Sequence, residues 1–322
     1  MAAGRISGFI TEDGRRRYAA AYARGMASLP EPAEVRDVPT PYGRVRVHRF
    51  GDAGPPVVLL PGRGGTVVMF APNVPELARH CRVYAVDLLG EAGHSVQTAP
   101  IRDGADQAAW LDAVLAALGI RGAHLVGVSI GGWAAANLAV RAPDRLASVT
   151  LLEPASTLAP ISAGMIMRVL ATYLPVVGDR ARRSFLTWIG GGDPVPEDDP
   201  AGQVIDAGMR YFRLALPAPP RFGDAQLRSI GVPVLVLLGG RSVVHDARRA
   251  LRRARALIPR VTAELWPAAT HALSGQFPAE VNARILRFAG AGEAGRRSAG
   301  PGDAAAGDQF DGGEDRDGLH RE

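Results

Sequence analysis

Ser129 is the residue best placed in this sequence to act as a nucleophile. It stands in the stretch 127–131, G-V-S-I-G, between the apolar run 123–126 and the helix-like segment 132–140. Glycine lacks a Cβ, so it permits the sharp strand-to-helix turn that lifts a serine hydroxyl above a sheet. The helix N-terminus behind the serine favours the negative charge that develops when a hydroxyl attacks a carbonyl. The pattern therefore predicts a catalytic serine, and the alternative is an ordinary Gly-Ser turn.

A serine hydroxyl is a weak nucleophile at neutral pH and needs a base within hydrogen-bond reach. The chain has seven histidines. His271 is preferred, because its loop follows the last expected strand, 261–266. His245 competes, since it also follows a strand at the C-terminal edge of the expected sheet, whereas His124 lies inside the strand before Ser129. The sequence therefore predicts that Ser129 and His271 act together on a carbonyl carbon.

A repeated strand-then-helix rhythm surrounds these residues and is typical of an α/β fold. Period-two alternation predicts a half-buried strand over 43–50, and the wholly apolar run 57–60 predicts a strand at the covered centre of a parallel sheet. Further strands are expected at 83–86, 123–128, 148–152, 232–238 and 261–266, and helices at 12–26, 69–80, 104–118, 130–142, 246–258 and 278–289.

Two stretches depart from this rhythm. Residues 155–228 combine helix-like segments with glycine and proline, and are expected to form a helical insertion between two strands. From Gly290 onward the sequence is rich in Gly, Ala and Asp and has almost no large apolar residues. Such a segment cannot bury enough apolar surface to offset its ordering entropy, so a disordered tail is expected.

The composition narrows the classes of function. All 37 basic residues are arginine, which excludes chemistry that needs a lysine amine, such as a Schiff base or a P-loop. The one cysteine, Cys81, allows no internal disulfide or metal cluster and is expected to be buried and inert. The arginines are scattered without interleaved aromatic residues, which favours a solvated surface over nucleic-acid binding. The absence of a long apolar run and of a signal-peptide core leads us to expect a cytoplasmic location without a membrane span.

Four motifs in the expected order make the chain resemble the α/β-hydrolase fold superfamily from about residue 8 to about residue 290. Segment 59–65 is similar to the H-G-x-G segment after that family's third strand. Segment 87–95 resembles the D-x-x-G-x-G-x-S segment after the fourth strand. Ser129 falls on the nucleophile elbow, and His271 falls where the family places its general base.

The resemblance implies a fold and a division of the chain. The fold is a mostly parallel central sheet flanked by helices, with a helical cap inserted after the sixth strand. The core is expected over 8–153 and 229–290, the cap over 154–228 and the disordered tail over 291–322.

The resemblance also implies an oxyanion hole. Two backbone N–H groups are needed to bind the developing oxygen anion. Ile130, which follows the nucleophile, is expected to supply one, and Arg63 the other. The Arg63 side chain either leans over the pocket, where it would favour an anionic substrate, or points into solvent.

The acid of the expected triad departs from the family pattern. The family usually carries it in a turn after the seventh strand, but Ser242 stands at that position here. Serine cannot carry the charge that stabilises an imidazolium. Glu153, at the end of the sixth strand, is the preferred acid, because some members of this fold carry theirs there. Asp246, which also suits a helix N-cap, and an absent acid remain as alternatives.

The expected function is a serine hydrolase that cleaves an ester, lactone or thioester through an acyl-enzyme, without a metal or an organic cofactor. The substrate is expected to be a small molecule with an apolar acyl or alcohol part. Alternatives on the same triad are a C–C bond hydrolase, a perhydrolase and a natural-product acyltransferase or cyclase, and the fold also serves non-catalytic binding proteins. The residues expected to line an apolar pocket in the cap are Met165, Met167, Leu170, Tyr173, Trp188, Tyr211 and Phe212.

Overall fold

A computed structural model describes residues 5–172, 178–192 and 195–291 of the chain. The main sheet runs in the order β11-β10-β8-β7-β4-β5-β3-β2, with β6 beside β3. The strands from β11 to β5 are parallel, while β3 is antiparallel to its three neighbours β2, β5 and β6. The strand bounds are β2 Glu34–Thr40, β3 Gly43–Phe50, β4 Pro56–Leu60, β5 Arg82–Val86, β6 Val96–Gln97, β7 Ala123–Val128, β8 Leu146–Leu152, β10 Val234–Gly239 and β11 Val261–Trp266.

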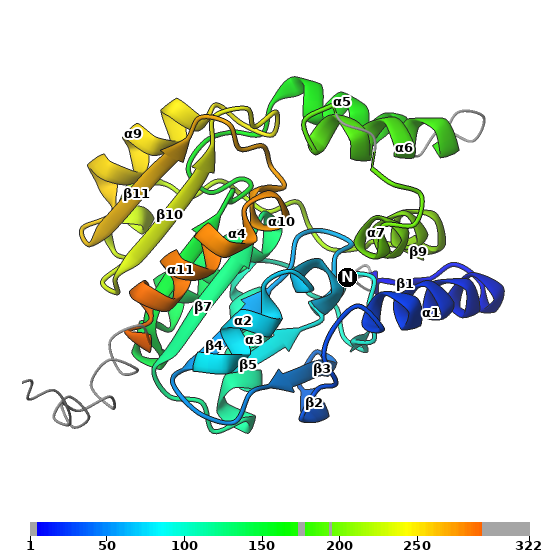
Figure 1. The fold of residues 1–322 in the computed structure, drawn as a ribbon, viewed down its shortest axis with the longest axis horizontal. Coiled ribbons are helices and arrows are strands. Elements are labelled where there is room, and N and C mark those ends of the chain that lie inside the picture. The colour runs from blue at the N-terminus through cyan, green and yellow to red at the C-terminus, as the bar shows by residue number, and fades with distance from the viewer. Residues whose placement is uncertain (1–4, 173–177, 193–194, 292–322) are drawn as a thin grey trace, which may run out of the picture.

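Helices cover both faces of this sheet (Figure 1). One hydrophobic core contains residues of α3, α4, α8 and α9, and a second contains residues of α1, α2 and α11. The bounds of these helices are α1 Glu12–Met26, α2 Val74–His80, α3 Gly104–Ala117, α4 Ile130–Arg141, α8 Asp224–Arg228, α9 Ala247–Leu257 and α11 Pro278–Phe288. The central strands are buried on both faces, which explains the wholly apolar run in β4.

The segment between β8 and β10 leaves the sheet and forms α5 Ala163–Ala171, α6 Gly178–Ile189, α7 Pro200–Tyr211 and the short strand β9 Phe212–Arg213. Helix α7 lies along α1, while α5 and α6 stand beside each other above the C-terminal edge of the sheet (Figure 1). Strand β9 pairs with β1, Gly8–Phe9, near the N-terminus. The N-terminal segment therefore contacts two parts of the molecule. Strand β1 and helix α1 contact the inserted segment, and α1 also packs in the core beneath the main sheet.

The predicted fold class, an α/β-hydrolase fold with helices inserted after the strand that ends at Leu152, is confirmed. One predicted helix, 69–80, is wrong as a single element. The structure has a 3₁₀ helix, η1 Val67–Phe70, followed by α2 from Val74. Pro72 lies at the break, and proline cannot continue a helix because it lacks the N–H and its ring clashes with the preceding turn. Pro75 lies in the first turn of α2, where a proline is tolerated.

Several other features were not predicted or fall outside the described residues. Strand β2 was missed, because Val38 is the one buried residue among its seven. The expected tail over 291–322 lies, apart from Ala291, outside the described residues. Cys81 is buried, and burial raises the pKa of its thiol to about 11, as expected of an inert cysteine. No helix in the described ranges is both long enough and apolar enough to cross a bilayer.

Candidate active site

Ser129 sits at the turn between β7 and α4 with φ 53° and ψ −113°. A positive φ is strained for a residue with a side chain, so the surrounding packing must hold it there. The Ser129 N–H donates to the carbonyl of Leu152 at 3.0 Å, which ties the turn to β8. A Cβ on Gly131 would lie 2.1 Å from the carbonyl oxygen of Leu60 on β4. The glycine at this position therefore allows α4 to start close against the sheet.

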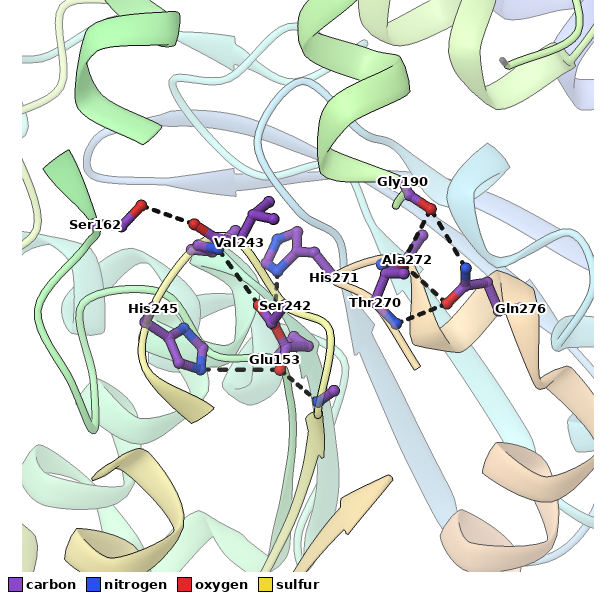
Figure 2. A network of polar contacts seen from close by, with 12 residues as sticks. Glu153, Ser162, Gly190, Ser242, Val243, His245, Thr270, His271, Ala272 and Gln276 are labelled. Carbon is purple, nitrogen blue, oxygen red and sulfur yellow. Dashed lines mark hydrogen bonds and ion pairs between the residues drawn. The ribbon is translucent and has the colours of Figure 1, made fainter. Parts of the chain in front are cut away.

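Glu153 follows the last residue of β8 and is fully buried, also with a positive φ of 50°. Its Oε1 atom accepts a hydrogen bond of 2.7 Å from the Gly239 N–H at the end of β10. Its Oε2 atom accepts from the Ser242 hydroxyl and lies 3.0 Å from Nδ1 of His271. Figure 2 shows the carboxylate between the Ser242 loop and His271. Two neighbouring strands and the base loop therefore converge on one carboxylate.

The contacts of Glu153 favour its charged form. Burial by itself raises the pKa of a carboxyl group, but the hydrogen bond and charge of His271 oppose this effect, together with His245 and the Ser242 hydroxyl. The balance holds the pKa of Glu153 below its ordinary value. Because an ionised carboxylate only accepts hydrogen bonds, Nδ1 of His271 must donate, and in the neutral ring Nε2 is then the acceptor. This is the tautomer that a general base requires.

Ser129 and His271 line the same cavity, which has a volume of about 660 Å³ between the sheet edge and the inserted helices. The inserted segment contributes mostly apolar side chains to the wall, together with the polar Thr172 and Asp199. The larger apolar ones include Met165, Val169, Phe185, Leu186, Ile189, Ile205, Met209, Phe212 and Leu214. Of the expected pocket residues, Met165 and Phe212 lie in this wall. Met167 and Leu170 are exposed instead, because they lie on the outer side of α5.

Trp188 and Tyr211 do not line this cavity. Trp188 carries the guanidinium of Arg168 over its ring at 4.2 Å, and Tyr211 lies near Arg210. Tyr173 lies outside the described residues.

The two expected oxyanion donors come from the start of α4 and from the loop after β4. Ile130 is the first residue of α4, so its N–H has no intrahelical acceptor. Arg63 lies in a tight loop after β4, where the Gly65 N–H donates to the Gly62 carbonyl at 3.0 Å. Arg63 lines the cavity that contains Ser129, and its side chain is 43% exposed.

The structure separates the other candidates from these roles. Asp246 is the N-cap of α9, where its side chain accepts from the Arg249 N–H at 2.9 Å, and it makes no contact with His271. His245 is buried on the far side of Glu153, with Nε2 3.8 Å from Oε1, and it does not line the cavity. Burial lowers the pKa of His245, although the Glu153 charge opposes this shift. His124 bonds to Ser148 between two strands.

Sequence reasoning missed the role of Ser242. The sequence shows only a serine where the family carries an acid, which predicts no role for it. In the structure its hydroxyl donates to the carboxylate that stands on the neighbouring strand. One signal could have indicated this contact. A hydroxyl follows β10 at Ser242, and a carboxylate follows the neighbouring strand β8 at Glu153.

The comparisons with known proteins agree with this geometry. Residues 55–191 match the family model described as alpha/beta hydrolase fold. An uncharacterized carboxylesterase, nap, of Bacillus subtilis (strain 168) is 31% identical over 279 residues, which cover 84% of this chain and 92% of the relative. The chain belongs to the α/β-hydrolase fold family.

Further α/β hydrolases resemble the chain over most of its length. Carboxylesterase YbfK of the same Bacillus subtilis strain is 31% identical over 84% of this chain and 93% of its own. The crystal structure of naproxen esterase, or carboxylesterase NP, from Bacillus subtilis superposes with a TM-score of 0.79 at 31% identity, covering 86% of this chain and 99% of that one. The likeness therefore includes the inserted helices.

Proposed function

We propose that this α/β hydrolase cleaves carboxylic esters through an acyl-enzyme on Ser129. That it is an ester hydrolase follows from its relatives, since two proteins named carboxylesterases match it over most of both chains. The observation that carries the mechanism is the Glu153–His271 contact of 3.0 Å beside the cavity that contains Ser129.

In the proposed reaction, His271 takes the proton of the Ser129 hydroxyl as the oxygen attacks the ester carbonyl. Glu153 holds the base in the correct tautomer and balances the imidazolium that forms. The backbone N–H groups of Arg63 and Ile130 stabilise the oxyanion. His271 then gives its proton to the leaving alcohol, and water hydrolyses the acyl-enzyme by the same steps.

The substrate is a small molecule, and we propose that its larger part is apolar. The cavity volume of about 660 Å³ is in the range of pockets that take drug-sized ligands. Most of the side chains that the inserted segment contributes are aliphatic, methionine or phenylalanine, which suits an apolar acyl or alcohol part, while Arg63, Glu91 and Asp199 are the charged residues of the lining. We propose a cytoplasmic location for the activity, which fractionation of cells that produce the chain would test.

Covalent labelling with a fluorophosphonate probe tests the proposed nucleophile, because only an activated serine reacts. We expect the wild-type chain to be labelled and to hydrolyse p-nitrophenyl esters. We expect Ser129→Ala to lose labelling and to lose at least about 10³-fold in kcat while keeping the wild-type melting temperature. A labelled Ser129→Ala variant would place the nucleophile elsewhere. A wild-type chain that binds esters without labelling or turnover would be a non-catalytic binding protein.

A further inference from the structure

Glu91 is a buried carboxylate beside the proposed oxyanion hole, and the mechanism above does not use it. Its side chain is 5% exposed. Its Oε1 atom has no hydrogen-bond partner in the described part of the chain. The nearest cation is Arg63, whose Nη2 atom lies 3.7 Å from that oxygen. An unpaired buried charge is costly, so this contact calls for an explanation.

The position of Glu91 relates it to both oxyanion donors. Glu91 and Arg63 line the cavity that contains Ser129. The same two residues also line a second cavity of about 260 Å³, and Ile130 forms part of that wall. The carboxylate thus shares one cavity wall with both of the residues whose N–H groups are the proposed donors.

A negative charge at this position opposes the reaction. The oxyanion that forms at the Arg63 and Ile130 N–H groups is also negative, and water screens little between two charges in a buried site. An uncompensated Glu91 would therefore raise the energy of the tetrahedral intermediate more than that of the neutral ester. A cation on the carboxylate removes this penalty.

We propose that the Arg63 side chain is the counter-ion of Glu91, and that the two act as a positioning pair that keeps the oxyanion hole free of net negative charge. This inference rests on the proposed function, because it needs an oxyanion at the Arg63 N–H. It gives Arg63 two separate roles: the backbone N–H binds the oxyanion, and the guanidinium neutralises its neighbour. Burial raises the pKa of Glu91, and the Arg63 charge and the Gly64 N–H work against that rise, so Arg63 is the side chain that favours the charged form of this carboxyl group.

A double-mutant cycle on kcat tests the pair. Arg63→Met keeps the backbone N–H and the apolar stem of the side chain but removes the charge. We expect it to lower kcat for a neutral p-nitrophenyl ester by about tenfold or more, with KM changed much less. Arg63→Lys, which retains a cation, should stay closer to the wild type. In the double variant Arg63→Met with Glu91→Gln, no buried charge is left unpaired, so kcat should return to within about threefold of the Glu91→Gln value. Arg63→Met should also lower the melting temperature, and the double variant should melt close to Glu91→Gln.

Three outcomes would overturn the proposal that Arg63 is the counter-ion of Glu91. The first is that the effects of Arg63→Met and Glu91→Gln on kcat simply multiply. The second is that Arg63→Met raises KM for an anionic ester and leaves kcat unchanged, which would make the guanidinium a substrate-binding group. The third is that Arg63→Lys is as slow as Arg63→Met. Failure of the proposed function is seen separately, because then the wild-type chain would not react with a fluorophosphonate at all.

Discussion

Glu153, the proposed acid of the triad, lies at the end of β8 and has partners on both of its carboxylate oxygens. Its two oxygens have different partners: the Gly239 N–H binds Oε1, whereas His271 and the Ser242 hydroxyl share Oε2. The backbone donor therefore orients the carboxylate, and the other oxygen faces the base. The Ser242 hydroxyl, at the position where the sequence resemblance led us to expect an acid, donates to the proposed acid Glu153.

We expect Glu153→Gln to lower kcat by about 10³–10⁴-fold with little change in packing. The Gly239 N–H requires an acceptor, so the amide oxygen of glutamine must face it. The amide NH₂ then faces Nδ1 of His271, which forces the proton onto Nε2 and leaves the base unable to accept from Ser129. The measurement is steady-state kinetics on a p-nitrophenyl ester, with circular dichroism as a check of folding.

Asp246→Asn is the matched control, because it also changes a carboxylate to an amide in the same loop region. Since Asp246 caps α9, we expect an unchanged kcat and a loss of at most about 1 kcal/mol in the free energy of unfolding. If Asp246→Asn were the slower variant, Asp246 would be the acid. If neither change mattered, a Ser-His dyad would carry out the reaction.

At the scale of elements, the nucleophile depends on how closely α4 approaches the sheet. The first turn of this helix packs against β4 and β7, and glycine at 127 and 131 makes this approach possible. The base loop depends in a similar way on the inserted helices. The Thr270 hydroxyl donates to the carbonyl of Gly190, just beyond α6, at 3.2 Å, and Gln276 bonds to both residues (Figure 2). Both catalytic loops are therefore held by segments distant in sequence.

Gly131→Ala should lower the free energy of unfolding by about 1–3 kcal/mol or more and reduce kcat. Its Cβ would lie 2.1 Å from the Leu60 carbonyl oxygen and 2.5 Å from that of Pro61, and backbone atoms cannot move aside without shifting the elbow. Gly231→Ala is the control, because its Cβ would meet nothing within 4 Å. Urea denaturation of both variants gives the comparison. Equal stabilities for the two would contradict the close approach of α4 to the sheet.

At the scale of the whole molecule, a buried polar cluster joins α1 to the main sheet. The Tyr22 hydroxyl on α1 lies 3.0 Å from Nε2 of His48 on β3 and donates to Asp87 after β5, also at 3.0 Å. Burial raises the pKa of Asp87 from 3.8 to about 6. Burial, with the Arg46 charge, lowers the pKa of His48 from 6.5 to about 4. Both shifts are toward the neutral form: Asp87 keeps its proton up to about pH 6, and His48 stays neutral down to about pH 4.

The two shifts act on stability in opposite directions. Asp87 binds its proton more tightly in the folded state, so its contribution to stability falls as the pH rises from about 4 to about 6. His48 binds its proton more weakly in the folded state, so its contribution rises as the pH increases from about 4 to about 6.5. In the wild-type chain these two pH-dependent contributions to the free energy of unfolding largely cancel.

We expect Asp87→Asn to leave the pH dependence of the free energy of unfolding that comes from His48. Relative to the wild type, the variant should gain about 1 kcal/mol or more in the free energy of unfolding between pH 4.5 and pH 6.5. His48→Gln should show the opposite change over the same interval. Denaturant titrations of the three proteins at both pH values provide the measurement. If the free energies of unfolding of both variants changed with pH as that of the wild type does, Asp87 and His48 would not have the shifted pKa values described above.

The sequence by itself predicted most strands and helices of the main sheet in their order, a nucleophile elbow at Ser129 and a base loop at His271, although it missed β2 and the break between η1 and α2. These follow from local patterns: apolar runs, glycines around one serine, and a histidine after the last strand. The sequence left the acid open among Glu153, Asp246 and none, because that choice depends on which strands are neighbours. Only the tertiary structure places β8 beside β10, so that Glu153 meets the Gly239 N–H and the Ser242 hydroxyl. The tertiary structure also brought Arg63 to Glu91, a contact across 28 residues that no local pattern encodes.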